Sequence, residues 1–200
     1  MIKVWVANIN SLNNDDIYQK YYLDLPPFRK KKADEYINKI DKIRSVAAFT
    51  LLIKLLNQNK IKYNQDEFKV DSYGKPYLLN SKIYFNISHS GDYVIAAISD
   101  KPIGVDVEIK KELKYIELSH LVLNEQEIKK INQIDNPSEF FFKMWTKKES
   151  YIKCIGKGLA IPLTSINDVK PYHIKYFKID HHQFAVCSKY KLYKFNIVSL

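Results

Sequence analysis

Glycine, proline and cysteine are scarce in this chain. Its 200 residues include five glycines and seven prolines, and no Ser/Gly-rich linker or low-complexity tract interrupts them. The two cysteines, Cys154 and Cys187, form neither a CxxC motif nor a metal-ligand spacing. No apolar run approaches the roughly 20 residues of a membrane span, and the first residues lack a signal peptide's apolar region. We therefore expect a compact, soluble, cytoplasmic protein with reduced cysteines.

Acidic residues are outnumbered. The chain has 22 Asp and Glu against 32 Lys and Arg, which gives a net charge of +10. Such a balance favours an anionic partner or substrate, such as nucleic acid, a phosphorylated small molecule, an acidic protein or an anionic membrane surface. Charge alone does not choose among these, and lysine-rich composition with much Ile, Asn and Tyr is also typical of AT-rich genomes.

The first third of the sequence predicts a strand followed by helices. Residues 2–9 are rich in β-branched and aromatic residues, as strands are. A helix then extends to residue 25, where two prolines end it. Apolar spacing over residues 34–57 predicts two helices, the second a long buried one over about residues 42–59.

Arg44 lies near the predicted start of that long helix. Free N–H groups at a helix N-terminus favour an anion, so Arg44 is a candidate phosphate contact. A surface ion pair with Asp41 is an equally good interpretation.

Two predicted turns carry candidate binding groups. Gly74 permits a tight turn that Pro76 stiffens, with Lys75 at its tip. Residues 83–98 predict a strand, a turn and a strand, and we place residues 88–91, Ser-His-Ser-Gly, in that turn. Hydroxyls beside an imidazole suit phosphate oxygens, although a lone histidine in a turn is more often structural.

An acidic strand lies near the middle of the chain. In residues 103–108, Ile-Gly-Val-Asp-Val-Glu, a period of two sends the valines to one face and Asp106 and Glu108 to the other. Neighbouring carboxylates repel one another unless a cation or a shared proton intervenes, and an all-oxygen pair suits Mg²⁺. The alternative is an edge strand with a solvated acidic face.

The second half predicts three helices and three strands. A helix over residues 115–123 precedes Asn124, an N-cap with Glu127 at the capping-box position, and a helix to residue 134. A further helix covers residues 137–155 and ends at the glycines that follow. The remaining segments alternate like antiparallel strands: residues 174–177, 184–188 and 192–198.

Trp145, Glu149 and Lys153 are spaced four apart on the helix over residues 137–155 and share a face. The alternative is a surface Glu–Lys pair worth about 0.3–0.5 kcal/mol. Because a tryptophan lies in the same row, we expect this face to be partly buried. Glu149 would then complete a three-carboxylate metal site with Asp106 and Glu108.

Five segments in this order and spacing resemble the 4′-phosphopantetheinyl transferases, in particular their larger monomeric group. They are Arg44, Gly74-Lys75-Pro76, residues 85–90 (FNISHS), residues 104–108 (GVDVE) and residues 145–153 (WTKKESYIK).

The resemblance implies an α+β fold, a pseudo-dimer of two similar α+β halves with the active site in the cleft between them. We expect residues 1–100 to form the half on the side of the coenzyme A 3′-phosphate and adenine, and residues 101–200 the half with the metal and catalytic motifs. The implied reaction transfers 4′-phosphopantetheine from coenzyme A to a serine of an apo acyl or peptidyl carrier protein. It releases adenosine 3′,5′-bisphosphate.

The resemblance also implies roles for single residues. Asp106, Glu108 and Glu149 correspond to the ligands of Mg²⁺, or of Mn²⁺ in its place. Glu149 and Lys153 correspond to the catalytic pair, and Glu127 matches a family acid near the metal. The residues implied in binding coenzyme A are Arg29, Lys32, Arg44, Lys75, Pro76, Ser88, His89 and Lys153.

Two other functions compete with this hypothesis. A basic nucleic-acid-binding module would explain the charge, but the basic residues are scattered and no nucleic-acid motif is present. Another Mg²⁺-dependent phosphoryl or nucleotidyl transferase would explain the acids, but no Walker loop or kinase signature is found. We therefore expect a monomer whose partners are coenzyme A and an acidic carrier protein, and neither nucleic acid nor a membrane.

Overall fold

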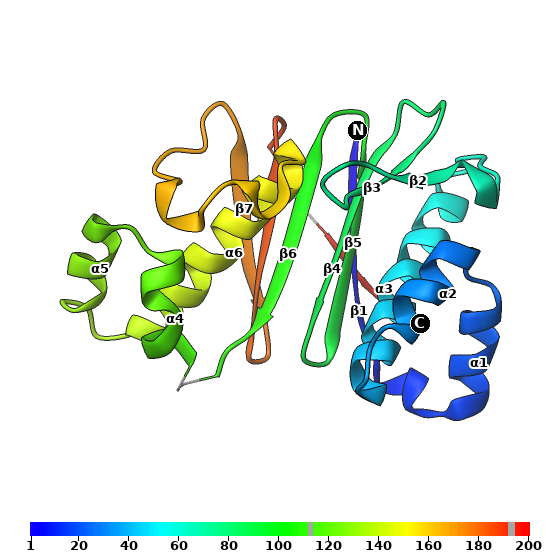
Figure 1. Cartoon of the computed structure of the whole chain (residues 1–200), viewed down its shortest axis with the longest axis horizontal. Coiled ribbons are helices and arrows are strands. Elements are labelled where there is room, and N and C mark those ends of the chain that lie inside the picture. The colour runs from blue at the N-terminus through cyan, green and yellow to red at the C-terminus, as the bar shows by residue number, and fades with distance from the viewer. Residues whose placement is uncertain (112–113, 192–194) are drawn as a thin grey trace.

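Two β-sheets meet at the centre of the computed structural model, which describes residues 1–111, 114–191 and 195–200 (Figure 1). One sheet has the strand order β4-β5-β1-β9 and the other the order β6-β8-β7. Each sheet carries its own helices, so the molecule consists of two α+β halves lying side by side. The expected α+β fold is confirmed.

The N-terminal sheet is built around β1 (Ile2–Asn8) and β5 (Tyr93–Ser99), which pair antiparallel along their whole lengths. β4 (Tyr84–Ser90) pairs antiparallel with the other side of β5. β9 (Asn196–Val198) completes the sheet in parallel with β1. Every residue of β5 is buried, as expected for a strand covered on both faces.

Three helices cover this sheet on one side (Figure 1). They are α1 (Asp15–Leu23), α2 (Pro27–Asp34) and α3 (Lys39–Gln58), after a short 3₁₀ turn, η1 (Asn10–Asn13). Asn14 caps α1 by accepting bonds from two backbone N–H groups. Along α3, apolar side chains such as Phe49, Leu52 and Leu56 are fully buried against the sheet.

Of the two helices predicted over residues 34–57, the second is confirmed as α3 and the first is wrong. Helix α3 begins at Lys39, and the segment before it is a turn in which Ile37 is 98% exposed. Ile37 therefore does not belong to the buried apolar stripe that the spacing indicated. Arg44 consequently lies in the second turn of α3, beyond the free N–H groups of its N-terminus.

A small hairpin projects from the N-terminal half toward the other half. It consists of β2 (Phe68–Val70) and β3 (Pro76–Leu78), preceded by the 3₁₀ turn η2 (Gln65–Glu67). Gly74 has a φ of +81° in the connecting turn, a conformation that glycine adopts without strain.

The C-terminal sheet comprises β6 (Ile103–Ile109), β7 (His173–Ile179) and β8 (His182–Ser188). β8 is the central strand and pairs antiparallel with both neighbours. We expected residues 192–198 to form a third antiparallel strand beside the other two C-terminal strands. This pairing is wrong, because β9 joins the N-terminal sheet instead. Residues 192–194 of that prediction lie outside the described residues.

Helix α6 (Pro137–Ile155) lies across this sheet, with the bounds that the sequence predicts. Gly156, with a φ of +71°, ends it in the left-handed conformation. The smaller elements of this half are α4 (Lys114–Val122), α5 (Glu125–Ile131), η3 (Gly158–Ala160) and η4 (Leu163–Ser165). No helix in the described part of the chain combines the length and apolar character needed to cross a membrane.

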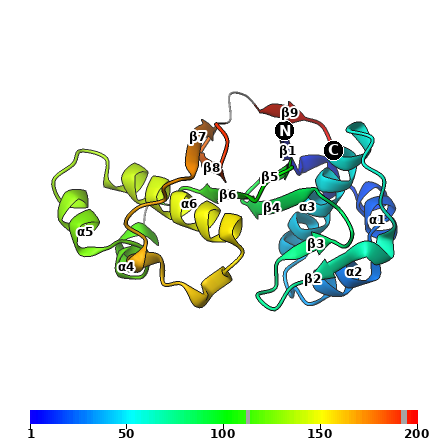
Figure 2. The ribbon, with the colours of Figure 1, turned by 90° about the horizontal axis from the view of Figure 1, so that it is seen from above.

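The two halves share a hydrophobic core. Val105 and Val107 of β6 pack with Val6 of β1 and Ile95 of β5. The valines thus lie on the face that the period-two pattern assigns to the core, with the acids opposite. Seen from above, β6 and β4 lie between α6 of one half and α3 of the other (Figure 2).

Gly104 lets α6 approach β6 closely. A Cβ atom at this position would lie 2.0 Å from the carbonyl oxygen of Ser150 and 2.3 Å from the amide nitrogen of Cys154. Both atoms are helix backbone, so a side chain here would push α6 away from β6. This contact fixes the helix that carries Glu149 and Lys153 over the strand that carries Asp106.

We predict that Gly104→Ala lowers the free energy of unfolding by at least about 2 kcal/mol, because the added methyl group overpacks a backbone contact. Urea unfolding followed by circular dichroism measures the loss. The control is Gly74→Ala, whose Cβ meets nothing within 4 Å and should cost only the positive-φ strain of about 1 kcal/mol. An equal or smaller loss at Gly104 would contradict the close approach.

Candidate functional site

Side chains join β4 and β6, which belong to different sheets. The Asn86 side-chain oxygen accepts a hydrogen bond from the Val105 amide at 2.8 Å, and the Ser90 hydroxyl accepts one from the Ile109 amide at 3.1 Å. Between them, the Ser88 hydroxyl donates to Asp106 Oδ1 at 3.0 Å. Alternate side chains of β4 thus face β6. Their hydrogen bonds connect the two strands where backbone hydrogen bonds would connect neighbouring strands of one sheet.

This geometry corrects the placement of the Ser-His-Ser segment. Ser88, His89 and Ser90 belong to β4, and the hairpin turn consists of Gly91 and Asp92. Gly91 has a φ of +55°, and a side chain there would collide with His182 Nε2. The strand therefore extends through residues that, by type, are common in turns.

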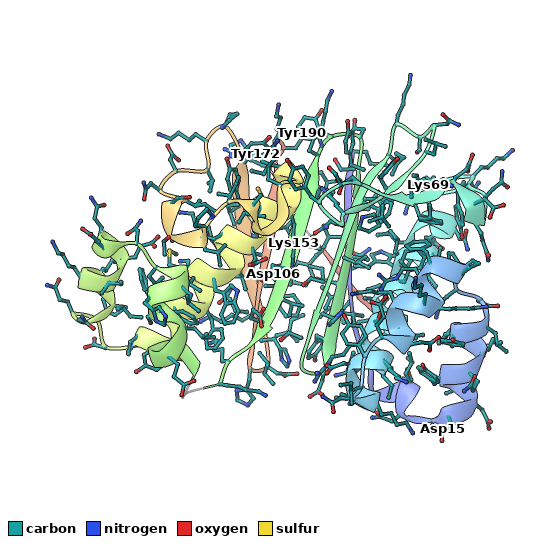
Figure 3. All side chains as sticks on the ribbon, viewed as in Figure 1. Asp15, Lys69, Asp106, Lys153, Tyr172 and Tyr190 are labelled. Carbon is teal, nitrogen blue, oxygen red and sulfur yellow. The ribbon has the colours of Figure 1, made fainter. Side chains whose placement is uncertain are left out.

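Asp106 is the buried centre of the site. It is 1% exposed, and its Oδ1 atom accepts hydrogen bonds from Ser88 and from the Lys153 ammonium, the latter at 2.5 Å. Its Oδ2 atom is buried without a partner among the described residues. Burial raises the pKa of Asp106, although Lys153 opposes the shift. Figure 3 shows Asp106 and Lys153 close together between the halves.

Glu108 lies two residues along the same strand. The Ser90 hydroxyl donates to its Oε2 atom at 3.1 Å. Since the same hydroxyl accepts from the Ile109 amide, its single proton is directed at the carboxylate. Burial, reinforced by the charge of Asp106, raises the pKa of Glu108 to about 8. The ionised pair is therefore costly unless a cation lies nearby.

Trp145, Glu149 and Lys153 form the opposite wall. All three are half-buried on one face of α6, as the spacing predicts, and the Trp145 ring stacks on Phe142 with centroids 6.0 Å apart. Burial raises the pKa of Glu149, and the charge of Asp106 adds to the shift. Burial alone would lower the pKa of Lys153, but Asp106 and Glu149 outweigh it and the net shift is upward. Lys153 is therefore an ammonium at neutral pH.

Strands β4 and β6 and helices α2 and α6 enclose a cleft of about 410 Å³ between the halves. It is lined by Arg29, Tyr36, Ile87, Ser88, His89, Asp106, Glu108, Trp145, Glu149 and Lys153. A neighbouring hollow of about 250 Å³ shares Glu108 and Trp145 with this cleft and adds Arg44 and Lys111. Carboxylates, a lysine and one arginine thus line the cleft, and a second arginine lines the hollow beside it.

The three predicted metal ligands line this cleft together. The described residues nevertheless contain no group of three or more His, Cys, Asp or Glu side chains close enough to form a ready metal site. The ammonium of Lys153 binds Asp106 instead. The donor chemistry still fits a hard cation, because the buried Asp106 Oδ2 has no partner and the donors would be carboxylate oxygens.

Comparison with known proteins identifies the family. Residues 102–195 match the 4′-phosphopantetheinyl transferase superfamily, and residues 15–101 match the N-terminal domain of 4′-phosphopantetheinyl transferases. The chain belongs to this superfamily. Its members typically use Mg²⁺ and coenzyme A, and they act on carrier proteins.

Individual relatives agree with this assignment. The chain is 27% identical over 190 residues to the 4′-phosphopantetheinyl transferase Sfp of Bacillus subtilis, covering 85% of this chain and 84% of that protein. It is 39% identical over 133 residues to the enzyme gsp of Aneurinibacillus migulanus, covering 65% of this chain. That second match spans 55% of the relative's length.

A vertebrate relative also matches. The L-aminoadipate-semialdehyde dehydrogenase-phosphopantetheinyl transferase of Xenopus laevis is 31% identical over 156 residues, covering 68% of this chain and 51% of that protein.

Arg29 and His89 form the basic side of the cleft. The Arg29 guanidinium donates to the Ser45 hydroxyl at 3.0 Å and to its carbonyl oxygen, while its Nε atom is buried without a partner in the described chain. Burial lowers the pKa of His89 to about 4, and the charges of Lys153 and Arg29 add to this effect. His89 is therefore neutral at pH 7 and can offer an N–H group but no charge.

Arg44 forms the ion pair with Asp41 that the sequence analysis gave as one of two alternatives. Its guanidinium binds Asp41 at 2.8 Å and also donates to the Gly91 carbonyl oxygen at 2.7 Å. It also lines the smaller hollow, and the expected phosphate contact of Arg44 stays a prediction. Lys32 pairs with Glu35 on the surface, and its ammonium lies 5.7 Å from the centroid of the Tyr36 ring at the cleft.

Lys75 and Pro76 are not among the residues that line the cleft. The Lys75 ammonium donates to the backbone carbonyl oxygens of Lys153, Ile103 and Cys154, in place of the expected phosphate contact. The contact with the Lys153 oxygen is short, at 2.5 Å, while those with the Ile103 and Cys154 oxygens are long, at 3.4 and 3.5 Å.

Glu127 has the capping role that its position predicts. Its side chain accepts from the Asn124 amide, and Asn124 accepts in turn from the Glu127 amide. The same carboxylate pairs with Lys148, whose side chain is fully buried and also donates to the Val122 carbonyl oxygen at 2.8 Å. Glu127 thus neutralises a buried lysine, and it does not line the acidic cleft.

Sequence reasoning missed Asn86 and Tyr36, and it placed Ser90 in a turn. Asn86 and Ser90 alternate with Ser88, so period-two spacing in the FNISHS segment could have identified them as one face of a strand. Tyr36 follows a basic helix and gives no local signal. Its ring meets the His89 ring edge-on at 6.4 Å between centroids.

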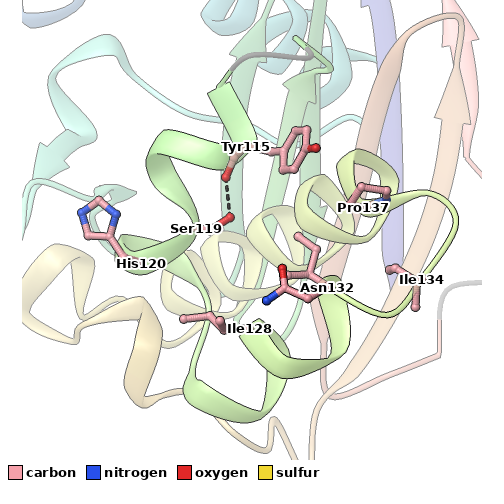
Figure 4. Close-up of a pocket in the computed structure, with 8 residues that line it drawn as sticks. Tyr115, Ser119, His120, Ile128, Asn132, Ile134 and Pro137 are labelled. Atoms are coloured by element: carbon pink, nitrogen blue, oxygen red, sulfur yellow. Dashed lines mark hydrogen bonds between the residues drawn. The ribbon is translucent and has the colours of Figure 1, made fainter.

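A larger pocket of about 570 Å³ lies elsewhere, between α4, α5 and the start of α6 (Figure 4). Its walls include Tyr115, Ile128, Ile131 and Pro137, and it shares no lining residue with the acidic cleft. The Ser119 hydroxyl donates a hydrogen bond to the Tyr115 carbonyl oxygen. The size of this pocket does not indicate the site of the chemistry.

We predict that Glu127→Ala lowers the free energy of unfolding by about 3 kcal/mol, because it leaves the buried Lys148 charge unpaired. Chemical denaturation measures this loss, and isothermal titration should find unchanged coenzyme A affinity. The control Glu125→Ala removes an exposed acid from the same first turn. Weaker coenzyme A binding at unchanged stability would instead place Glu127 in the binding site.

The low pKa of His89 predicts a pH-dependent stability. Between pH 6.5 and about 4 the unfolded chain binds a proton at this histidine and the folded chain does not, so acid favours unfolding. From pH 7 to pH 5 the wild type should lose roughly 2 kcal/mol relative to His89→Gln.

Urea titrations of both proteins at the two pH values measure this difference. The control His120→Gln alters an exposed histidine of α4 and should follow the wild type. Equal stability changes in the wild type and His89→Gln would contradict a partly buried, neutral His89.

Proposed function

We propose that this chain transfers the 4′-phosphopantetheine moiety of coenzyme A to a serine of an apo acyl or peptidyl carrier protein, with adenosine 3′,5′-bisphosphate as the second product. One observation carries the proposal. Asp106, Glu108, Glu149 and Lys153 line one cleft together with Arg29. Carboxylates, a lysine and an arginine around one space are what a diphosphate and its counter-cation require.

Asp106, Glu108 and Glu149 would hold the Mg²⁺, or Mn²⁺, that the family uses. The unpartnered Asp106 Oδ2 and the raised pKa of Glu108 both support the binding of a cation at this end of the cleft. When bound, such an ion neutralises charge on the diphosphate.

Lys153 stabilises the leaving group in this proposal. Its ammonium lies at the cleft with a 30% exposed side chain, hydrogen-bonded to Asp106 and Ser88. From there it can donate to a phosphate oxygen whose negative charge grows as adenosine 3′,5′-bisphosphate departs. If the Lys153 ammonium turned to the phosphate, Asp106 Oδ1 would keep the Ser88 hydroxyl as its partner.

Glu149 is our candidate for the general base. It lines the cleft, and no hydrogen bond or ion pair of its carboxylate is found within residues 1–111, 114–191 and 195–200. Burial raises its pKa, although Lys153 opposes the shift, and a more basic carboxylate accepts a proton from a serine hydroxyl more readily.

The phosphates would meet the N-terminal half. Arg29, Ser88 and His89 line the cleft, and Arg44 lines the adjoining hollow. We assign the 3′-phosphate to the arginines, because a guanidinium binds phosphate oxygens in pairs. Lys32 stands at the rim beside Tyr36 and could approach the same group.

The carrier protein would approach from the open side of the cleft. A net charge of +10 favours an acidic partner and speeds its encounter with the site. Nucleic acid is not needed to explain this charge.

We predict that Asp106→Asn and Glu149→Gln each lower the rate of transfer at least about 100-fold, because each removes a carboxylate that acts at the reacting phosphate. Mass spectrometry of apo carrier proteins incubated with coenzyme A and Mg²⁺ detects the added phosphopantetheine arm.

The control Asp66→Asn changes an exposed acid of η2 and should transfer at the wild-type rate. Circular dichroism spectra of all variants should match the wild type. If both site variants remain active, the assignment of these acids is wrong. If the wild type modifies no carrier protein across a panel of acyl and peptidyl carriers, the proposed activity is refuted.

A further inference from the structure

Lys75 bridges the two halves of the molecule. It lies on the hairpin of the N-terminal half, between β2 and β3, while the oxygens that accept its three hydrogen bonds belong to β6 and α6. Two of those oxygens, from Lys153 and Cys154, are in the last turn of α6, and the third is that of Ile103 at the start of β6.

These carbonyl oxygens need a donor. The last four carbonyl groups of an α-helix have no partner within the helix, and the Gly156 amide satisfies only that of Ile152, at 2.9 Å. A cation at the C-terminal end of a helix also interacts favourably with the helix dipole. Lys75 thus caps α6 from the other half of the protein.

The turn that carries Lys75 is itself held in place. The Asp71 side chain accepts hydrogen bonds from the amides of Tyr73 and Lys75, both at 2.9 Å. A Cβ atom at Gly158 would lie 3.3 Å from the Tyr73 carbonyl oxygen, so this turn packs on the segment after α6. The Lys157 ammonium lies 5.4 Å from the centroid of the Tyr73 ring.

The bridge acts on a residue of the site. Lys153 is held at both ends, by Lys75 at its carbonyl oxygen and by Asp106 and Ser88 at its ammonium. The bond to Ile103 ties the same cation to the strand that carries Asp106 three residues later. A shift of the last turn of α6 would therefore move the Lys153 ammonium relative to Asp106.

We propose that Lys75 is a positioning residue for the reaction: its ammonium fixes the end of α6 against β6 and so sets the place of Lys153, without touching coenzyme A. The predicted effect on kcat rests on the proposed transfer activity. In this proposal Lys75 affects the reaction by holding the backbone carbonyl oxygen of Lys153. The Lys75 side chain itself does not bind coenzyme A.

The test is a separation of turnover from binding. In Lys75→Met, kcat for transfer to an apo carrier protein should fall at least about tenfold, since small misplacements of a catalytic group are costly. The dissociation constant of coenzyme A, measured by isothermal titration with Mg²⁺ present, should change less than about twofold, because no contact to the ligand is lost.

Lys75→Gln keeps one hydrogen-bond donor and provides the milder variant if Lys75→Met does not fold. Its kcat should lie between those of Lys75→Met and the wild type. The matched control is Lys69→Met, which removes an exposed lysine of β2 in the same hairpin (Figure 3). It should leave kcat and coenzyme A affinity unchanged.

Amide hydrogen exchange tests the bridge without any reaction. Exchange at residues 155–157 should accelerate about tenfold in Lys75→Met, because the last turn of α6 loses its cap. This result stands even if the wild type transfers nothing, so failure of the proposed function is distinguishable from failure of the bridge.

Two results would overturn the proposal. Coenzyme A affinity that falls tenfold or more in Lys75→Met would make Lys75 a ligand contact. Unchanged kcat and unchanged exchange at the end of α6 would show that the hydrogen bonds of Lys75 position nothing.

Discussion

The structure depends on the burial of one carboxylate, Asp106, where two α+β halves meet. A buried charge without partners is costly, and this one is compensated from both sides, by Ser88 of the N-terminal half and Lys153 of the C-terminal half. The N-terminal half therefore supplies one of the two partners of a carboxylate that belongs to the C-terminal half. The Asp106 Oδ2 atom, however, has no partner within the described residues. A bound cation would provide that partner.

The join between the halves explains where the cleft lies. The side chains of Asn86, Ser88 and Ser90 connect β4 to β6 without a backbone ladder, and the valines of β6 bury their face in a core shared with the N-terminal sheet. The polar face of β6 is then free to line an opening. The close approach at Gly104 lays α6 across the same strand, so Glu149 and Lys153 face the acids from the other wall.

Local patterns predicted the parts of this site that local physics determines. The four-residue spacing of Trp145, Glu149 and Lys153 gave the correct face of α6, and alternation gave the correct face of β6. Long-range contacts left no such signal. The pairing of β9 with β1 and the hydrogen bonds of the Lys75 ammonium depend on segments far apart in sequence. A lysine at the tip of a turn looks exposed until another half of the protein packs against it.

The most direct test of the account is a crystal structure with coenzyme A and Mn²⁺, whose anomalous scattering locates the ion. We predict a peak beside Asp106 Oδ2, with Glu108 and Glu149 around it, and the diphosphate between the ion and the Lys153 ammonium. An ion bound outside the cleft, or a diphosphate away from Lys153, would contradict the central claim that the buried charge between the halves is the binding site.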